Sequence, residues 1–461
     1  MLIFVFLLDF HVNEHVRHKF YFTLTVYFMR KNLKSKLAAA FVVVLCLSMF
    51  LALVLQVTAQ QSSGDWPMFR ANIMHTGEAA GSPVLYPKLL WNFTTGNIVV
   101  SSPAVVNRVV YIGSGDDNVY ALNATNGRPL WNYTTGGPVY SSPAVINGVV
   151  YIGSYDANVY ALNVATGSKI WNYKTHGPVV SSPNVANGVL YIGSEDSNVY
   201  ALNASDGAKL WNFTTGGAVD SSPAVAYGMV YVGSDDGNVY GLNATDGAHV
   251  WNRPTGPIFV WSSPSVVNGI VYVGSDNDNF YALNATTGTQ IWYYPTLGDV
   301  GSSPAVAGGV VYIGSDDDDV YALNAATGAK IWNYNTSLYV GSAPAVVGGV
   351  VYVGSYDDNI YALNAKNGNK LWQYITEGHV ASSPAVVNGA LYVGSFDGKV
   401  YALAGSPTTP TLHLSFNALF IIFGAVAAVV VVVATLVTIL LFRKRFRDKP
   451  SGPSLRQRAL L

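Results

Sequence analysis

The chain has 461 residues, of which 11% are charged and 13% aromatic, and it contains 45 glycines. This composition favours short, turn-rich strands over a helical or disordered chain. Residues 61–410 carry 23 Asp and Glu against 12 Lys and Arg, so the net charge of −1 hides an acidic body with basic ends. An acidic body argues against a nucleic-acid partner, because phosphate binding needs a basic surface. With Cys46 as the single cysteine, the folded body has no disulfide framework, cysteine zinc site or thiol nucleophile.

The first predicted element is an apolar segment that follows a basic stretch. Residues 1–36 form an N-terminal extension with a basic end, and residues 37–59 form an apolar run that finishes with small residues at Ala59. This pattern is typical of a secretory signal peptide, whose natural start would be Met29. Because an apolar run of this length can also cross a bilayer, an uncleaved anchor is the alternative interpretation.

An internal repeat of about 40 residues follows a lead-in at residues 60–90 and occupies residues 91–404. One tyrosine of a Tyr-Ala-Leu or Tyr-Gly-Leu motif marks each copy: Tyr120, Tyr160, Tyr200, Tyr240, Tyr281, Tyr321, Tyr361 and Tyr401. Tryptophan keeps the same spacing at Trp91, Trp131, Trp171, Trp211, Trp251, Trp292, Trp332 and Trp372. Periods of this length indicate a repeat architecture in which neighbouring units cover each other's apolar faces.

Each copy predicts four short strands. In the second copy, residues 141–146 and 149–154 are β-branched runs joined by Asn147-Gly148, a dipeptide typical of a tight hairpin turn. Residues 158–163 and 170–173 supply a third and a fourth strand. Four antiparallel strands every 40 residues predict the blades of a propeller.

The phase of the repeat predicts how the ring closes. Trp91 has no Tyr-Ala-Leu motif eleven residues before it, and Tyr401 has no tryptophan eleven residues after it. The strand around Trp91 is therefore expected to complete the blade that Tyr401 begins, which leaves no open sheet edge. The prediction is an all-β, eight-bladed propeller of four-stranded antiparallel blades.

The C-terminal part predicts a membrane anchor. A short linker at residues 405–417 leads to an uncharged apolar run at residues 418–442, long enough to cross a bilayer as a helix, and a basic tail at residues 443–461 follows. Since positive residues stay cytoplasmic, the propeller is expected on the outer side of a cell membrane.

The repeat resembles a known family. Ala-Leu-Asn followed by Gly and Trp, as in residues 121–131, is similar to the tryptophan-docking motif of quinoprotein dehydrogenases and their non-enzymatic relatives. Residues 65–70 (DWPMFR) also resemble the lead-in of such secreted propellers. The resemblance implies that each repeat tryptophan packs between adjacent blades. The dehydrogenases hold a quinone against adjacent cysteines beside a calcium ion, and this chain has no cysteine pair. We therefore expect a member of the non-enzymatic branch, without a catalytic residue or cofactor.

The turn after each Gly-Ser carries an acid in seven copies: Asp116, Asp156, Asp196, Asp236, Asp317, Asp357 and Asp397. The fifth copy has Asn277. An acidic rim that recruits divalent cations or a basic partner is one interpretation. The other is that Asp and Asn bond their own backbone in tight turns. The densest cluster, Asp316, Asp317, Asp318 and Asp319, is the best metal candidate, although four adjacent side chains cannot all surround one ion.

Serine begins the inner strand of most copies: Ser101, Ser141, Ser181, Ser221, Ser262, Ser302 and Ser382. These hydroxyls are expected around the central channel, either as ligands for a sugar or peptide or as partners of backbone groups. His176, His249 and His379 lie in different copies, so no Ser-His-Asp set is predicted. Trp261 interrupts the pattern beside a one-residue insertion, and it is either a ligand platform or a space-filling residue.

Sequons for N-glycosylation are frequent: Asn92, Asn123, Asn132, Asn203, Asn212, Asn243, Asn284 and Asn335. An exported domain could use them, although the repeat itself brings Asn and Thr together. The function expected from the sequence is a binding or scaffolding module that holds a protein or an envelope polymer. The alternatives are a quinone- or metal-dependent oxidoreductase and an assembly factor for envelope proteins.

Overall fold

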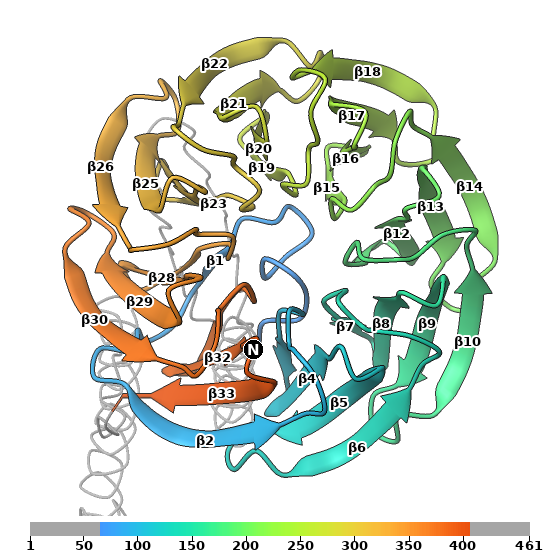
Figure 1. Cartoon of the computed structure of the whole chain (residues 1–461). Helices are drawn as coiled ribbons and strands as arrows, with labels where there is room; N and C mark the ends of the chain where they lie inside the picture. The colour runs from blue at the N-terminus through green and yellow to red at the C-terminus, as the bar shows by residue number, and fades with distance from the viewer. Residues whose placement is uncertain (1–64, 406–461) are drawn as a thin grey trace, which may run out of the picture. The chain divides into compact units, whose positions relative to one another are not determined.

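A computed structural model describes residues 65–405, which form a closed ring of eight β-sheets around a central channel (Figure 1). Six sheets are consecutive four-stranded blades, the seventh blade adds the short strand β1 (Glu78–Ala79) to its own four strands, and the eighth combines the two ends of the described chain. This confirms the predicted all-β propeller. No helix capable of crossing a membrane occurs within residues 65–405. The predicted segments at residues 37–59 and 418–442 lie outside the described residues.

The strands follow one another from the channel outwards in each blade. Blade 1 contains β3 (Ala104–Val106), β4 (Val109–Gly113), β5 (Asn118–Asn123) and β6 (Pro129–Thr134), and blade 2 contains β7 (Ala144–Ile146), β8 (Val149–Ser154), β9 (Asn158–Asn163) and β10 (Lys169–Lys174). Blade 3 contains β11 (Asn184–Ala186), β12 (Val189–Gly193), β13 (Asn198–Asn203) and β14 (Lys209–Thr214), and blade 4 contains β15 (Ala224–Ala226), β16 (Met229–Gly233), β17 (Asn238–Asn243) and β18 (His249–Pro254). Blade 5 contains β19 (Ser265–Val267), β20 (Ile270–Ser275), β21 (Asn279–Asn284) and β22 (Gln290–Pro295), and blade 6 contains β23 (Ala305–Ala307), β24 (Val310–Gly314), β25 (Asp319–Asn324) and β26 (Lys330–Asn335). Blade 7 contains β27 (Ala345–Val347), β28 (Val350–Gly354), β29 (Asn359–Asn364) and β30 (Lys370–Ile375), and blade 8 contains β31 (Ala385–Val387), β32 (Ala390–Gly394), β33 (Lys399–Ala404) and β2 (Lys88–Thr94).

Tight turns connect the first two strands of each blade. In blade 2, Asn147 has φ of 50° and Gly148 has φ of 81°, as a type I′ hairpin turn requires. Glycine also ends several second strands because the next segment passes very close. A Cβ on Gly274 would lie 2.1 Å from the carbonyl oxygen of Val300.

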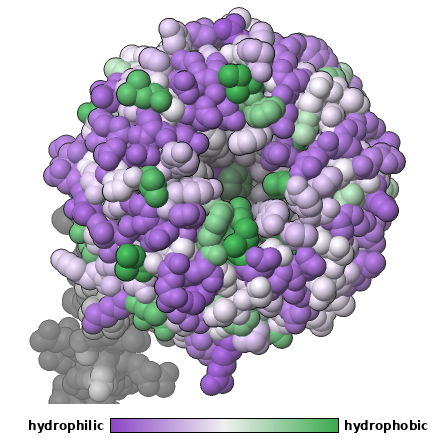
Figure 2. Space-filling view, in the orientation of Figure 1, coloured by the Kyte–Doolittle hydropathy of each residue, from purple (hydrophilic) through white to green (hydrophobic). Residues whose placement is uncertain are grey.

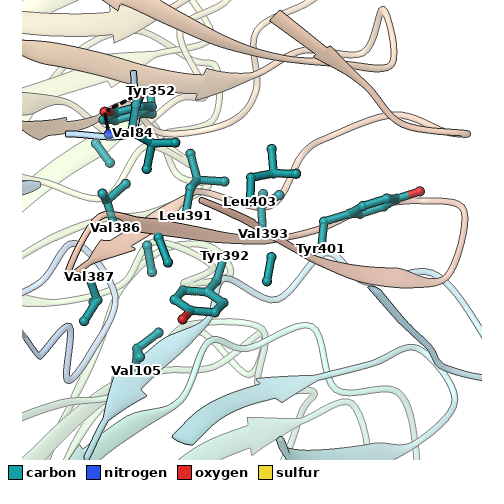
Figure 3. Close-up of a cluster of buried hydrophobic side chains, with 14 of the residues drawn as sticks. Val84, Val105, Tyr352, Val386, Val387, Leu391, Tyr392, Val393, Tyr401 and Leu403 are labelled. Atoms are coloured by element: carbon teal, nitrogen blue, oxygen red, sulfur yellow. Dashed lines mark hydrogen bonds between the residues drawn. The ribbon is translucent and has the colours of Figure 1, made fainter. Parts of the chain in front are cut away.

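The seam closes as the phase of the repeat predicts. β2 pairs antiparallel with β33, and Trp91 lies opposite Ala402. Figure 3 shows the apolar side chains that this last blade buries, among them Leu391, Val393 and Leu403. The ring therefore has a core at its junction as well as between its consecutive blades.

The core of the ring is divided into clusters between neighbouring blades. One cluster, for example, contains Trp211 of blade 3 and Val230 of blade 4. The indole nitrogen of Trp211 donates a hydrogen bond of 3.2 Å to the carbonyl oxygen of Ala244, in the turn before the outer strand of the next blade. Since every blade lends one such tryptophan to its neighbour, burial of apolar surface couples each blade to the next.

The seam lacks the turn that would accept the tryptophan of blade 7. The lead-in replaces it, because Trp372 donates its indole hydrogen bond to the carbonyl oxygen of Val84 at 2.7 Å. The hydroxyl of Tyr352 accepts a hydrogen bond from the amide of the same Val84 at 2.7 Å (Figure 3). One residue of the lead-in thus supplies both contacts.

The rest of the lead-in runs through the channel along the inner strands (Figure 1). Inner-strand amides donate hydrogen bonds of 2.7–2.9 Å to its carbonyl oxygens, in the pairs Val105–Trp66, Val145–Pro67, Val225–Ile73, Val266–Met74, Val306–Thr76 and Val346–Gly77. Strand β1 (Glu78–Ala79) pairs parallel with β27. These bonds satisfy inner-edge groups that three-residue strands would otherwise leave without a backbone partner.

Arg70 is the most deeply buried charged residue of this lead-in. Its guanidinium donates hydrogen bonds to the carbonyl oxygens of Pro304 and Pro344 in two neighbouring blades. Burial lowers the pKa of Arg70 to about 9, because a dry interior disfavours the charged form. Arg70 therefore ties the channel segment to blades 6 and 7 through backbone groups.

Candidate functional site

One face of the ring carries two kinds of segment side by side. The first is the turn between the second and third strand of each blade, and the second is the segment that leads from the outer strand of one blade to the inner strand of the next. They are joined by backbone hydrogen bonds, such as the 3.1 Å bond from the Asp276 amide to the carbonyl oxygen of Phe259. We call the inner part of this face the mouth of the channel. Figure 2 shows a ring face that is mostly hydrophilic and hollowed at its centre.

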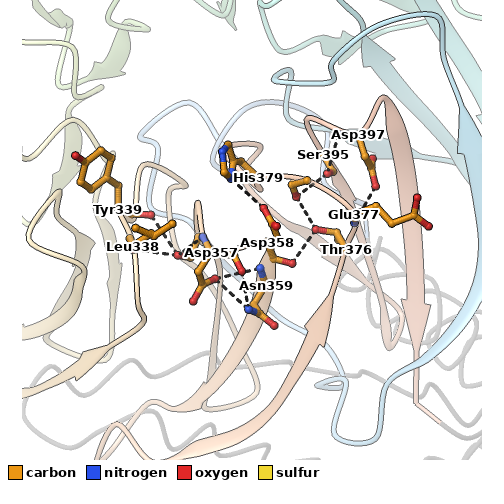
Figure 4. A network of polar contacts seen from close by, with 12 residues as sticks. Leu338, Tyr339, Asp357, Asp358, Asn359, Thr376, Glu377, His379, Ser395 and Asp397 are labelled. Atoms are coloured by element: carbon orange, nitrogen blue, oxygen red, sulfur yellow. Dashed lines mark hydrogen bonds and ion pairs between the residues drawn. The ribbon is translucent and has the colours of Figure 1, made fainter.

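The acid predicted as a rim in seven copies is a turn residue. In blade 3, the Oδ2 atom of Asp196 accepts hydrogen bonds from the Tyr200 hydroxyl at 2.7 Å and from the His176 amide at 2.8 Å. Burial opposes ionisation of Asp196, but the hydrogen bonds outweigh it and lower the pKa. Figure 4 shows two such turn acids as acceptors, Asp357 for the amide of Asn359 in blade 7 and Asp397 for the amide of Glu377 in blade 8.

The same role is filled in the fifth blade by Asn277. Its amide nitrogen lies 2.7 Å from the hydroxyl of Tyr281 and also donates to the carbonyl oxygen of Thr255. An amide can replace the carboxylate because the turn needs polar partners for its backbone and for the repeat tyrosine. The turn interpretation of these seven acids and one amide is the one that the geometry supports.

The Asp316–Asp319 cluster is spread over several environments. Asp317 accepts the hydroxyl of its repeat tyrosine, Asp318 has a φ of 71°, and the Oδ2 atom of Asp319 accepts a hydrogen bond from Asn333 on the outer strand. Only Asp316 belongs to the mouth. Within residues 65–405, no three His, Cys, Asp or Glu side chains converge closely enough to hold a metal ion.

The residue before each turn acid or amide varies around the ring among glycine, tyrosine, glutamate, aspartate and phenylalanine. Along the ring these residues are Gly115, Tyr155, Glu195, Asp235, Asp276, Asp316, Tyr356 and Phe396. The facing segments contribute further varied side chains, including Tyr140, Asp220, Phe259, Trp261, Asp299, Tyr339 and His379. The copies of the repeat thus share nearly the same turn residues but differ in the residues at the mouth. Sequence reasoning had named Asp316, Trp261 and His379 among these positions but missed the others, whose signal was their variation between otherwise similar copies.

Six carboxyl groups form a continuous arc at the mouth, from blade 3 to blade 6. We call this arc the acidic crescent; its members are Glu195, Asp220, Asp235, Asp276, Asp299 and Asp316. Burial raises the pKa of all six, and neighbouring carboxylates raise the pKa of every member except Glu195. The pKa reaches about 7 for Asp220 and Asp276 and about 6 for Asp316.

Aromatic side chains accompany the crescent. Trp261 stacks on Phe259 with ring centroids 5.4 Å apart and an angle of 12°. Trp261 is 48% exposed, and its indole partly offsets the rise that burial causes in the pKa of Asp235. The insertion therefore presents the indole at the mouth, as the ligand-platform interpretation requires.

Both ends of the crescent continue into aromatic pairs. The ring centroids of Tyr155 and Tyr140 lie 5.7 Å apart, and Tyr155 partly offsets the rise that burial causes in the pKa of Glu195. At the other end, Tyr356 stacks on His379 at 5.1 Å. The His379 ring also lies 2.9 Å from a carboxyl oxygen of Asp358 (Figure 4).

The serines at the inner strands are structural links between blades. Ser141 donates its hydroxyl to the carbonyl oxygen of Ser181 at 2.9 Å and accepts the Gly153 amide at 3.0 Å. Ser342, which the sequence pattern did not single out, has the same contacts in blade 7. These hydroxyls form hydrogen bonds with backbone groups, in agreement with the interpretation that they are partners of the backbone rather than ligands for a sugar or peptide.

The sequons fall into two groups by position. Four precede the outer strand and use their Oδ1 atoms as acceptors inside the turn: Asn123, Asn203, Asn243 and Asn284. Four lie exposed on outer strands: Asn92, Asn132, Asn212 and Asn335. The second group has the accessibility that glycan attachment requires.

Together these features define a repeat propeller with acidic and aromatic side chains at one mouth of the channel. Residues 87–185, 177–266 and 256–411 match the family model described as "Outer membrane protein assembly factor BamB". These stretches cover most of the chain. The protein belongs to this family of PQQ-like repeat propellers, as the sequence resemblance indicated. No curated protein matches the sequence significantly.

Solved structures with the same ring include enzymes and non-enzymes. BamB from Moraxella catarrhalis is 21% identical, with a TM-score of 0.61 over 69% of this chain and 99% of that protein. Quinohemoprotein alcohol dehydrogenase from Comamonas testosteroni is 16% identical, with a TM-score of 0.65 over 76% of this chain and 82% of the dehydrogenase. The computationally designed Ika8 protein is 16% identical, with a TM-score of 0.62 over 70% of this chain and all of the design. At these identities the similarity establishes the fold, and function must come from the site.

Proposed function

We propose that this protein is a membrane-anchored binding or scaffolding module, and that its propeller holds a protein partner on the outer side of a cell membrane. The observation that carries the proposal is the distribution of variation around the ring. The turns and blade contacts repeat in almost every copy, whereas the acidic crescent and its aromatic neighbours do not. A repeat protein that keeps its blade contacts while the side chains at one mouth vary has a surface available for recognition on an intact scaffold.

The anchoring part of the proposal rests on the sequence. The uncharged run at residues 418–442 and the basic residues after it support a single crossing with the C-terminus inside. Protease added to intact cells is expected to remove the propeller and leave the basic tail protected. Full protection of the propeller would contradict the outward orientation.

Partner binding at the mouth can be tested by site-specific photo-crosslinking in cells. Leu297 is 91% exposed in the segment entering blade 6, two residues from Asp299, so a photoreactive residue there reports on the mouth. Asp206, which is exposed in the turn before the outer strand of blade 3, is the control position. A discrete crosslinked protein from position 297, without the same product from position 206, is expected. Equal labelling at both positions, or none, would count against partner binding at the mouth.

Within this proposal, the family description favours a partner among envelope proteins under assembly. The second candidate, a quinone-linked oxidoreductase, is favoured by the similarity to quinohemoprotein alcohol dehydrogenase. The residues present do not fit that cofactor, because the mouth offers neither a cysteine pair nor a converging metal-ligand set within the described residues. Reconstitution with the quinone and calcium separates the two: a stoichiometric bound chromophore with dye reduction would establish the oxidoreductase.

A further inference from the structure

The acidic crescent contains carboxyl oxygens without any partner. Asp276 is 7% exposed, and its Oδ1 atom accepts no hydrogen bond. The Oδ1 atoms of Asp220 and Asp235 are also buried and unpaired. A buried carboxylate without a partner is costly, so such a site is completed by a cation or by protonation.

The described part of the chain supplies no cation to the crescent. Its two ion pairs are His379–Asp358 and Lys399–Glu377, and neither includes a crescent residue. The charges that act on Asp276 all come from carboxylates, namely Asp299, Asp316 and Asp235. A positive ligand would therefore be attracted without first displacing a partner from within residues 65–405.

The shape of the crescent argues against a single metal ion. Calcium needs six to eight oxygen atoms around one point, whereas the six carboxyls are distributed along four successive blades and no three of them converge on one position. An arc of this kind matches several positive charges in a row. An extended peptide can present several positive side chains along one line, so that different blades bind different residues of the same peptide.

The aromatic side chains indicate which cation is involved. Trp261 and Phe259 are both nearly half exposed and stand beside Asp235 and Asp276. A lysine ammonium or arginine guanidinium within about 6 Å of an aromatic ring centroid is attracted to its face. A hard metal ion would gain little from these rings, so carboxyls interleaved with aromatic faces favour an organic cation.

We propose that the acidic crescent binds a basic segment of the partner protein, with its Lys or Arg side chains placed against the carboxyls of blades 3 to 6 and against Trp261. This inference rests on the proposed function and specifies the chemistry of the partner. The partner segment is extended, carries several positive charges and crosses the mouth along the arc.

The direct test measures peptide binding to the full-length protein in detergent by fluorescence anisotropy. The probe is a labelled decapeptide of alternating lysine and serine, and its control is the same peptide with every lysine acetylated. The proposal expects binding of the lysine peptide only, weakened by added salt because the contacts are ionic. Equal binding of the acetylated peptide, or no binding of either, would overturn it.

Two charge-matched variants locate the binding. The double variant Asp235→Asn and Asp276→Asn removes two crescent charges, and the double variant Asp206→Asn and Asp246→Asn removes two exposed charges from turns on the other face. The first is expected to lose on the order of tenfold in affinity and the second less than twofold, since close charge pairs dominate such coupling. Equal losses would show attraction to the whole acidic body and would contradict a crescent site.

Two further measurements complete the test. Trp261→Ala is expected to weaken binding several-fold, whereas Leu210→Ala, which truncates a half-exposed side chain on the outer strand of blade 3, leaves it unchanged. Calcium is tested as the alternative ligand. If calcium binds stoichiometrically, the double variant of Asp235 and Asp276 abolishes this binding, and the peptide does not bind, then the crescent is a metal site and the proposed basic segment is wrong. If the peptide fails to bind but position 297 still crosslinks its partner, the partner chemistry is wrong and the binding function stands. If crosslinking fails while the peptide binds, the crescent has the proposed chemistry but the proposed binding function at the mouth is wrong.

Discussion

The buried carboxyl of Asp276 predicts an unusual response of stability to pH. Its pKa of about 7 in the folded protein compares with the ordinary value of 3.8, because burial and the neighbouring carboxylates disfavour ionisation. One pKa unit corresponds to about 1.4 kcal/mol, so ionised Asp276 penalises the folded state by about 4 kcal/mol, and solvent at the mouth reduces this penalty to about 2 kcal/mol. Since the pKa is raised on folding, the penalty is absent below about pH 4 and develops fully as the pH rises through about 7.

Asp276→Asn removes this charge and nearly preserves the shape of the side chain. At pH 8 the variant is expected to be more stable than the wild type by about 2 kcal/mol, whereas at pH 4 the two are expected to be equal. Urea denaturation of the full-length protein, followed by tryptophan fluorescence at both pH values, measures the difference.

The matched control is Asp236→Asn in the turn of blade 4. There burial is outweighed by hydrogen bonds from Tyr240, Gly216 and Asn238, so the pKa is lowered, and the carboxylate stabilises the folded state at pH values above the ordinary pKa. This variant is expected to be less stable than the wild type at pH 8, with a difference that shrinks in acid. A destabilising effect of Asp276→Asn at pH 8, or an effect independent of pH, would refute the account of the crescent.

Two further predictions concern the scaffold. Trp91→Ala at the seam is expected to cost about 3–5 kcal/mol of unfolding free energy, while Leu90→Ala, half exposed beside it, costs less than about 1 kcal/mol; equal losses in thermal unfolding would contradict the closure of the ring through this strand. Gly274→Ala places a Cβ 2.1 Å from a backbone oxygen, whereas Gly301→Ala meets nothing within 4 Å. The first is expected to lower the midpoint of thermal unfolding by several degrees and the second to leave it within about one degree; similar midpoints would show that the two blades do not approach so closely.

The ring itself could be predicted because its causes are local and repeated. Asn-Gly turns, β-branched runs and a tryptophan every 40 residues each specify one blade, and the phase between Trp91 and Tyr401 specifies the seam. The path of the lead-in could not be predicted from local sequence. Its hydrogen bonds reach inner strands up to 269 residues away, as in the pair Gly77 and Val346, and no local pattern in the lead-in announces such contacts.

The features of the candidate site also fall into those that the sequence predicts and those that depend on the tertiary structure. The sequence by itself determined the repeat, the number of blades, the closing strand and the turn acids, because these depend on neighbouring residues and on the period. Only the tertiary structure decided that the turn acids are used as backbone caps and that the residues before them form the crescent. Glu195 and Asp316 are distant in the chain and meet along one arc only after the ring has closed. Burial and mutual repulsion, which set the chemistry of these carboxyls, exist only when the blades are assembled.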